Sequence, residues 1–223
     1  MRPTKQMSES VRIGALLAAS GGFMDAYSYI QRDHVFANAQ TGNILLFGVN
    51  LSEGNFSGAL RYFLPVIAFV IGIALAERVK LKTMPFLHWR QISVLIEAII
   101  FAVVALMPLS LNVPANALIS FACGIQVESF RKIRGNAIAT TMCIGNTRSG
   151  TENLCKFIQT KDREFLYKSM LYYGIILCFV IGAVIGNFCI YIWAEKAILC
   201  CSVMLIVTFI VMFVDYERDE REN

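Results

Sequence analysis

Long apolar runs separated by short polar segments dominate the chain. A helix needs about 20 mostly apolar residues to cross the hydrocarbon core of a bilayer. Six runs approach that length, and the last is the clearest because no charged residue falls between Leu199 and Val214. The pattern therefore predicts an all-α transmembrane protein of about six helices, in which residues 1–223 form a single membrane domain with short tails at 1–10 and 215–223. The predicted spans are 11–30, 59–79, 89–109, 114–130, 169–192 and 196–214.

Two further segments, 35–51 and 136–154, fit neither a membrane span nor a plain loop. The first reads VFANAQTGNILLFGVNL and the second reads NAIATTMCIGNTRSGTENL. Each is too polar and too short to cross a bilayer, yet too apolar for an exposed connection. We therefore expect each one to be a re-entrant or a short interfacial segment.

The chain contains an internal repeat. Five residues of the first half recur in the same order 103 positions later: Gly21, Asp25, Ile30, Gly42 and Asn43 match Gly124, Glu128, Ile133, Gly145 and Asn146. The motif FVIG at 69–72 recurs at 179–182. Repeat 1 then covers about 11–109 and repeat 2 about 114–214. Because each unit has three spans, the second must run in the opposite direction. This predicts two inverted three-helix repeats, an arrangement typical of transporters.

Composition and charge agree with a membrane location. Of the 223 residues, 57% are hydrophobic and 16% are charged, whereas about a quarter of a soluble globular chain is charged. Under the predicted spans, 17 of the 20 Lys and Arg residues fall on one side of the membrane, and only Arg32, Arg61 and Lys196 fall on the other. Loops rich in Lys and Arg stay in the cytoplasm. We therefore expect a multi-pass membrane protein with both termini and both tails in the cytoplasm.

Three carboxyl groups inside the predicted spans are candidates for function, because an ionisable residue in a membrane is costly. Asp25 lies near the outer end of the first span and Glu128 near the inner end of the fourth, at matching positions of the repeat. Glu97 lies nearer the middle of the third span. Proton coupling through Asp25, Glu97 or Glu128 is one interpretation. The alternative is that Asp25 and Glu128 are interfacial or capping residues and that Glu97 only bonds a neighbouring helix.

The polar residues of the two intermediate segments indicate a candidate binding site. A Thr or Asn before an apolar run is a helix N-cap signal, and the free N–H groups at such a helix start could hold an anion or a carboxylate. A capped short helix at the membrane surface is the alternative. The candidate substrate-binding residues are Asp25, Tyr29, Asn38, Thr41, Gly42, Asn43, Gln126, Glu128, Thr140, Thr141, Gly145 and Asn146.

Signatures of enzymes, metal sites and nucleic-acid binding are missing from the sequence. It contains no HExxH, GxSxG, P-loop or GxGxxG motif. It has only two histidines, and its seven cysteines form no CxxC pair. The basic residues lie in short loops beside helices, as membrane topology requires. We expect no enzymatic activity, no cofactor, no metal and no nucleic-acid partner.

A specific motif occupies the first span and the segment after it. Its residues are Gly22, Asp25, Ala26, Ser28, Tyr29, Val35, Phe36, Asn38, Thr41, Gly42 and Asn43, and a second-half pattern is matched by Gly124, Gln126, Thr140, Thr141 and Gly145. This motif resembles the signature of the YoaK-like family, bacterial integral membrane proteins that carry a domain of unknown function. The resemblance spans nearly the whole chain. It implies a six-helix protein of the bacterial inner membrane, but it supplies no substrate.

These features favour a secondary transporter or facilitator of a small solute, with proton coupling as one option. A channel-like or dimeric pore of the same fold is an alternative, and so is a membrane scaffold or accessory subunit without transport. The expected partners are the lipid bilayer and an unknown small solute, and a homodimer stays open.

Overall fold

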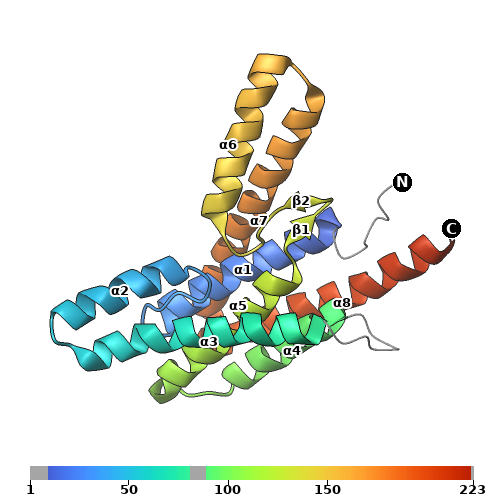
Figure 1. Ribbon diagram of the computed structural model, residues 1–223. Coiled ribbons are helices and arrows are strands. Elements are labelled where there is room, and N and C mark those ends of the chain that lie inside the picture. The colour runs from blue at the N-terminus through green and yellow to red at the C-terminus, as the bar shows by residue number, and fades with distance from the viewer. Residues whose placement is uncertain (1–9, 81–88, 222–223) are drawn as a thin grey trace.

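The computed structural model describes residues 10–80 and 89–221, with side chains up to Met212, and these residues are mostly helical (Figure 1). In chain order the elements are α1 (Val11–Gln31), α2 (Gln40–Ser52), α3 (Phe56–Lys80), α4 (Trp89–Val104), η2 (Leu109–Leu111), α5 (Asn112–Ser129), β1 (Lys132–Ile133), β2 (Asn136–Ala137), α6 (Cys143–Thr160), α7 (Arg163–Trp193), η3 (Ala194–Ala197) and α8 (Ile198–Arg221).

Every predicted span overlaps one observed helix, but several bounds differ. Helix α7 begins at Arg163, six residues before its predicted start, because Asp162 caps it: the Asp162 Oδ1 accepts a hydrogen bond from the Glu164 N–H at 2.9 Å. Helix α4 ends at Val104, five residues before its predicted end. Of the predicted tails, residues 1–9 and 222–223 lie outside the described residues, and the backbone of α8 continues through 215–221.

Helices α2 and α6 occupy the two intermediate segments, and a small hairpin that the sequence analysis did not predict precedes α6. Strands β1 and β2 pair in antiparallel register, with Ile133 opposite Asn136. The two residues between them, Arg134 and Gly135, both have positive φ (48° and 76°). Such a two-residue turn matches the twist of paired strands and favours glycine.

The surface and the helix lengths identify a membrane protein. Within the described residues, three stretches are long and apolar enough to cross a bilayer by length and composition: Phe56–Lys80, Leu109–Ser129 and Arg163–Met212. Large apolar side chains are exposed along these stretches; Val70 is 54% exposed and Phe188 is 65% exposed. Water is a poor solvent for such a surface, and lipid is a good one. The chain is therefore an all-α membrane protein, apart from the small hairpin.

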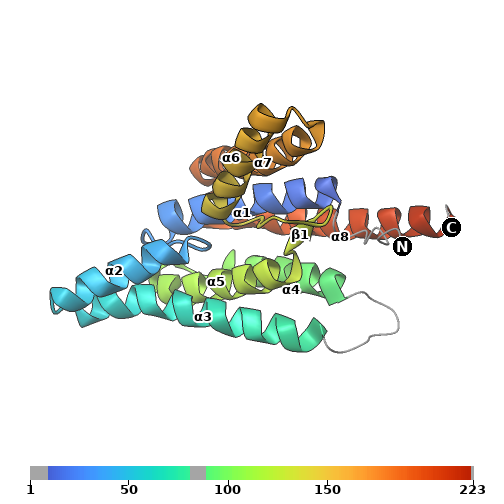
Figure 2. The same ribbon diagram turned by 45° about the horizontal axis from the view of Figure 1, so that its top comes forward.

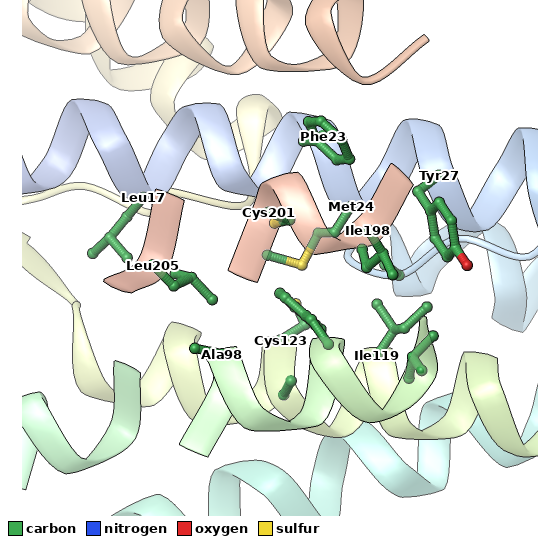
Figure 3. Close-up of a cluster of buried hydrophobic side chains, with 14 of the residues drawn as sticks. Leu17, Phe23, Met24, Tyr27, Ala98, Ile119, Cys123, Ile198, Cys201 and Leu205 are labelled. Atoms are coloured by element: carbon green, nitrogen blue, oxygen red, sulfur yellow. The ribbon is translucent and has the colours of Figure 1, made fainter. Parts of the chain in front are cut away.

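The helices form a stack with α1 and α8 facing α4 and α5 (Figure 2). Helix α7 packs on the other side of α1, and α3 packs on the other side of α5. The apolar core lies in the middle of this stack, where Met24 and Leu205 from one side meet Ala98 and Ile119 from the other (Figure 3). The C-terminal end of α6 and the N-terminal end of α7 project away from the core, as do α2 and the start of α3 (Figure 1).

Two close helix crossings depend on glycine. A Cβ atom at Gly22 of α1 would overlap the backbone of α7, and one at Gly182 of α7 would overlap the backbone of α1. In the same way, a Cβ at Gly72 of α3 would overlap the backbone of α5, and one at Gly124 of α5 would overlap that of α3. Small residues at such crossings let helix backbones touch, which strengthens packing inside a membrane.

Candidate functional site

The first polar loop, residues 32–39, folds back from the end of α1 into the middle of the molecule. Asp33 and His34 both have positive φ (61° and 59°), which reverses the chain direction after α1. The Asn38 side chain then donates a hydrogen bond from Nδ2 to the Gly21 carbonyl at 2.7 Å. Gly21 is at the midpoint of α1, so α2 starts halfway along α1 rather than at its end.

The same side-chain clamp holds both polar loops. The Asn43 amide pairs with the backbone of Phe36, accepting from its N–H at 3.1 Å and donating to its carbonyl at 2.8 Å. The Asn146 amide pairs with the backbone of Ala139 in the same manner, at 3.2 and 2.6 Å. Both asparagines are buried, and each reaches back seven residues. We call this contact the asparagine clamp; it holds each loop extended just before a helix begins.

The second loop, residues 138–142, meets α1 at the same level as the first. A Cβ at Gly21 would lie 3.1 Å from the Thr140 carbonyl oxygen and 3.3 Å from the Thr141 methyl carbon. The Gln126 Nε2 donates to the Thr140 Oγ1 at 3.1 Å and to the Leu17 carbonyl at 3.2 Å. Both loops therefore contact one short section of α1. We call this region the loop junction; it comprises Asp25, Asn38, Gln126, Thr140 and Thr141, grouped around Gly21.

The Asp25 carboxylate binds the backbone N–H groups that directly precede α2. Its Oδ1 accepts a hydrogen bond from the Asn38 N–H at 2.8 Å, and the N–H groups of Ala37 and Ala39 also face its carboxylate. Backbone N–H groups at a helix start attract an anion. A carboxylate of the protein itself therefore binds the backbone directly before the helix start that the sequence analysis proposed for an anionic ligand.

Two amide oxygen atoms of the loop junction, Asn38 Oδ1 and Gln126 Oε1, are buried without a hydrogen-bond partner. The Thr141 Oγ1 is also buried, and its side-chain partner is the Cys123 thiol. Both amide groups donate from nitrogen to backbone carbonyls, which cannot donate in return, so their orientation is determined by the contacts. Buried polar atoms are nearly always paired in native proteins. The junction therefore offers acceptor atoms that its own side chains leave unused.

Glu97 of α4 is fully buried in the core beside the loop junction. Neither of its carboxyl oxygens has a hydrogen-bond partner within the described residues. The Cys123 thiol interacts electrostatically with both Glu97 and Asp25, which places both carboxyl groups near it. Cys123 lies in the middle of the core between α1 and α4 (Figure 3).

Glu128 occupies a different environment from Asp25. It lies at the end of α5, where its Oε1 is 3.3 Å from an Arg131 nitrogen and 3.7 Å from the Lys80 ammonium nitrogen. The structure thus places Asp25 against a loop and Glu128 in an ion cluster at the molecule's end. The glycine crossings also differ by one residue from the sequence repeat, which aligns Gly21 with Gly124. In the structure it is Gly22 that makes the helix contact corresponding to that of Gly124.

The remaining candidate residues lie around the loop junction rather than in it. The Tyr29 ring is exposed and stacks on His34 and Phe36, with ring centroids 4.9 and 5.0 Å apart. Gly42 packs against the Phe36 ring. Thr41 and Gly145, in the first turns of α2 and α6, are exposed.

Arg32 is a buried charge that the sequence analysis counted only as an outer loop cation. It is fully buried, and its Nε donates to the Tyr27 hydroxyl at 3.0 Å. Its two terminal nitrogens donate to the carbonyls of Val104, Met107 and Pro108 and to the Asn112 side chain. It thereby caps the end of α4, which explains why this helix stops early. One signal was available: Arg32 is a rare cation on the side with few Lys and Arg residues.

The loop junction groups polar side chains that could bind a small polar solute or ion. Among the residues that the structure describes, no three His, Cys, Asp or Glu side chains are grouped to hold a metal ion. The loop junction instead combines a carboxylate, two amide oxygens and two threonines in the interior of a membrane protein.

Comparisons with known proteins place the chain in a family. A family model described as "Protein of unknown function (DUF1275)" matches residues 13–211. The chain is also 26% identical over 179 residues to the UPF0700 transmembrane protein YoaK of Bacillus subtilis (strain 168), which covers 77% of this chain and 80% of that protein. No solved structure matches. The YoaK-like resemblance is confirmed, and the chain belongs to the DUF1275 family of proteins of unknown function.

Proposed function

We propose that this protein is a secondary transporter or facilitator of a small solute, built from two inverted repeats that cross the bacterial inner membrane six times. Repeat 1 is α1 to α4, and repeat 2 is α5 to α8. Loops rich in Lys and Arg would lie in the cytoplasm with both termini. The observation on which the proposal depends is that two polar loops fold back from opposite ends and meet beside Gly21.

The packing of the helices supports the inverted repeat. Helix α1 packs on α7 as α5 packs on α3, and α1 packs on α8 as α5 packs on α4. Helix α2 lies on α3 as α6 lies on α7, and α4 packs on its own counterpart α8. Exchanging the two halves leaves this set of contacts unchanged, as a two-fold axis requires. The paired glycine crossings and the paired asparagine clamps follow the same exchange.

The two loops enter from opposite ends because α1 and α5 are antiparallel. The Arg32 side chain, just after α1, binds Asn112 at the start of α5, while Gln126 near the end of α5 binds the Leu17 carbonyl in the first half of α1. Backbone that is not helical is tolerated at membrane depth only where protein buries it or where it lines a cavity. Helices that start at the midplane next to such loops are the usual sites for substrates and ions in transporters.

A ligand screen on the detergent-purified protein tests the proposal. A small solute that binds the folded state raises the melting temperature by mass action. We expect a stabilising solute whose effect is lost in Asn38→Ala and kept in Asn153→Ala, an asparagine on α6 away from the junction. Saturable uptake of that solute by proteoliposomes would establish transport, and single-channel currents would identify a pore. Absence of both, with a protein partner retained from native membrane, would identify a scaffold.

Proton coupling through Asp25, Glu97 or Glu128 belongs to the same proposal. Two carboxyl groups, Asp25 and Glu97, lie in the interior near Cys123, while Glu128 is paired with cations at the molecule's end. We expect Asp25→Asn or Glu97→Gln to abolish solute uptake driven by a proton gradient, and Glu128→Gln to retain it. Proton-driven uptake that survives removal of all three carboxyl groups would reject coupling.

A further inference from the structure

The chemistry of the loop junction narrows the class of ligand, an inference that rests on the proposed transport function. Its oxygen atoms with free capacity to accept are Asn38 Oδ1 and Gln126 Oε1, which have no partner, and Thr141 Oγ1, whose side-chain partner is the Cys123 thiol. The donor nitrogens of both amides are already bound to backbone carbonyls. A ligand that satisfies the junction must therefore supply hydrogen-bond donors or a positive charge.

An anionic ligand does not fit this region. The N–H groups of Ala37, Asn38 and Ala39, which directly precede α2, face the Asp25 carboxylate, so these donors are already bound within the protein. The guanidinium donors of Arg32 are bound to carbonyl, hydroxyl and amide oxygens. Adding a second negative charge near Asp25 would be opposed by Coulomb repulsion in a low-dielectric interior.

A divalent cation also fits poorly. Calcium and magnesium sites combine several carboxylates or retain several waters, whereas the junction has one carboxylate, that of Asp25, among neutral oxygens. One negative charge with neutral amide, hydroxyl and carbonyl oxygens matches a single positive charge. Unwound backbone and neutral oxygens of this kind coordinate sodium in transporters with broken helices.

We propose that the loop junction binds one small monovalent cation, an alkali metal ion or ammonium, between the two polar loops. Asn38 Oδ1, Gln126 Oε1 and Thr141 Oγ1 supply neutral ligand atoms, and Asp25 supplies the counter-charge. The contacts of both loops with Gly21 mean that such an ion joins repeat 1 to repeat 2. A cation at this place would stabilise the state in which the loops meet.

Thr141→Val is the sharpest test, because it removes an atom whose side-chain partner is only the Cys123 thiol. The Thr141 methyl group packs near Gly21, and valine keeps it. A thiol is a weak hydrogen-bonding group, so loss of this contact costs little stability. We therefore expect the melting temperature of the variant in choline chloride to stay close to that of the wild type.

The experiment titrates the purified full-length protein with sodium, potassium or ammonium chloride against choline chloride at equal ionic strength. We expect one of the three cations to raise the melting temperature in a saturable manner. The apparent affinity should fall about tenfold or more in Thr141→Val, as expected for about 1.4 kcal/mol of lost coordination. Thr147→Val, an exposed threonine on α6, should bind like the wild type, and Thr141→Ser should restore binding. Comparing the salts distinguishes a metal ion from ammonium.

Two results would overturn the cation site. The first is a melting temperature that shows no saturable rise with any of the three cations, which would mean that buried water satisfies the oxygen atoms. The second is a rise that is unchanged in both Thr141→Val and Asp25→Asn. The transport function and the cation site can be rejected independently of each other. A saturable cation shift without uptake of any solute by proteoliposomes would keep the site and reject the transporter. Solute uptake by proteoliposomes without a saturable shift from any of the three cations would keep the transporter and reject the cation site.

Discussion

At the scale of single residues, the interior of this protein contains ionic groups whose surroundings differ greatly. Arg32 is fully buried, yet carbonyl, hydroxyl and amide oxygens surround its guanidinium and satisfy its donors. Glu97 is equally buried and has no partner for either oxygen within the described residues. The first group is therefore expected to stabilise the fold, whereas the second costs stability and is a candidate for function.

Arg32→Lys should destabilise the protein although the charge is kept. A lysine has three donors on one nitrogen and cannot reach the separated oxygens of Tyr27, Val104, Met107 and Asn112 together. Each buried acceptor left unpaired costs about 1–3 kcal/mol, so we expect a loss of at least about 2 kcal/mol. Thermal unfolding in detergent measures it, with Arg61→Lys on partly exposed α3 as the control. Equal melting temperatures for the two variants would contradict the role of Arg32.

Glu97→Met should have the opposite effect on stability. Methionine has a similar length and needs no hydrogen bond, so the variant removes the cost of a buried polar group without leaving a large cavity. We expect a melting temperature at or above that of the wild type, together with loss of proton-driven uptake. A clear drop in stability would show that Glu97 has a structural partner, and normal uptake would show that it is not needed for coupling.

At the scale of elements, two kinds of contact determine how helices and loops fit together. Glycines permit backbone contact where α1 crosses α7 and where α3 crosses α5. Asparagine clamps hold the loops before α2 and α6 in an extended form. Both contacts involve backbone atoms, which cannot move aside as a side chain can, so both should be intolerant of substitution.

Gly182→Ala should weaken the crossing of α7 with α1. The added Cβ would overlap the carbonyl of Ala19, and relief requires the helices to separate. Overpacking of this kind typically costs about 1–3 kcal/mol. Gly174→Ala on the same helix is the matched control, because a Cβ there meets nothing within 4 Å. That control should be neutral or stabilising, since alanine favours a helix by up to about 1 kcal/mol. Equal effects of the two substitutions on the melting temperature would contradict the crossing.

Asn43→Ala and Asn146→Ala should each release one polar loop. Each variant leaves the N–H and carbonyl of a loop residue, Phe36 or Ala139, without their side-chain partner. We expect a loss of about 1–3 kcal/mol from either change and faster hydrogen exchange confined to the loop concerned. Asn153→Ala on α6 should change stability by less than about 0.5 kcal/mol. Exchange that stays slow in both loops would show that the clamps do not hold them.

At the scale of the whole molecule, the exchange of contacts between the two halves is the main feature. Each of the helix pairs, glycine crossings and asparagine clamps has a counterpart when the two halves are exchanged. The chemistry, however, is not duplicated, because Asp25 binds the N–H groups that precede α2 whereas Glu128 pairs with Lys80 and Arg131. The two halves therefore share their packing but differ in the partners of their carboxyl groups.

Labelling of cysteine in intact spheroplasts tests the proposed orientation. In a variant that retains only Cys155, an exposed residue of α6, a membrane-impermeant maleimide should react in inverted vesicles but not in spheroplasts. A second variant with Ser52→Cys, at the exposed end of α2, as its single cysteine should react in spheroplasts. Labelling of both positions from the same side would reject the inverted arrangement of the two halves.

The sequence by itself determined the helical elements and the membrane class, because a long apolar run can bury its backbone polar groups only as a helix in lipid. It also located both polar segments, since asparagine, threonine and glycine interrupt the apolar pattern there. Helix bounds were less accurate: the early end of α4 depends on Arg32, which is distant in sequence.

Only the tertiary structure decided which polar groups meet. The loop junction joins Asn38 to Thr140 and Gln126 through α1, and no local pattern records contacts over such separations. It also showed that Asp25 binds the backbone directly before α2 and that Glu128 does not share this role, although the repeat aligned them. The physical reason is that apolar periodicity reports what each helix buries, whereas hydrogen-bond pairing depends on how helices from both halves cross.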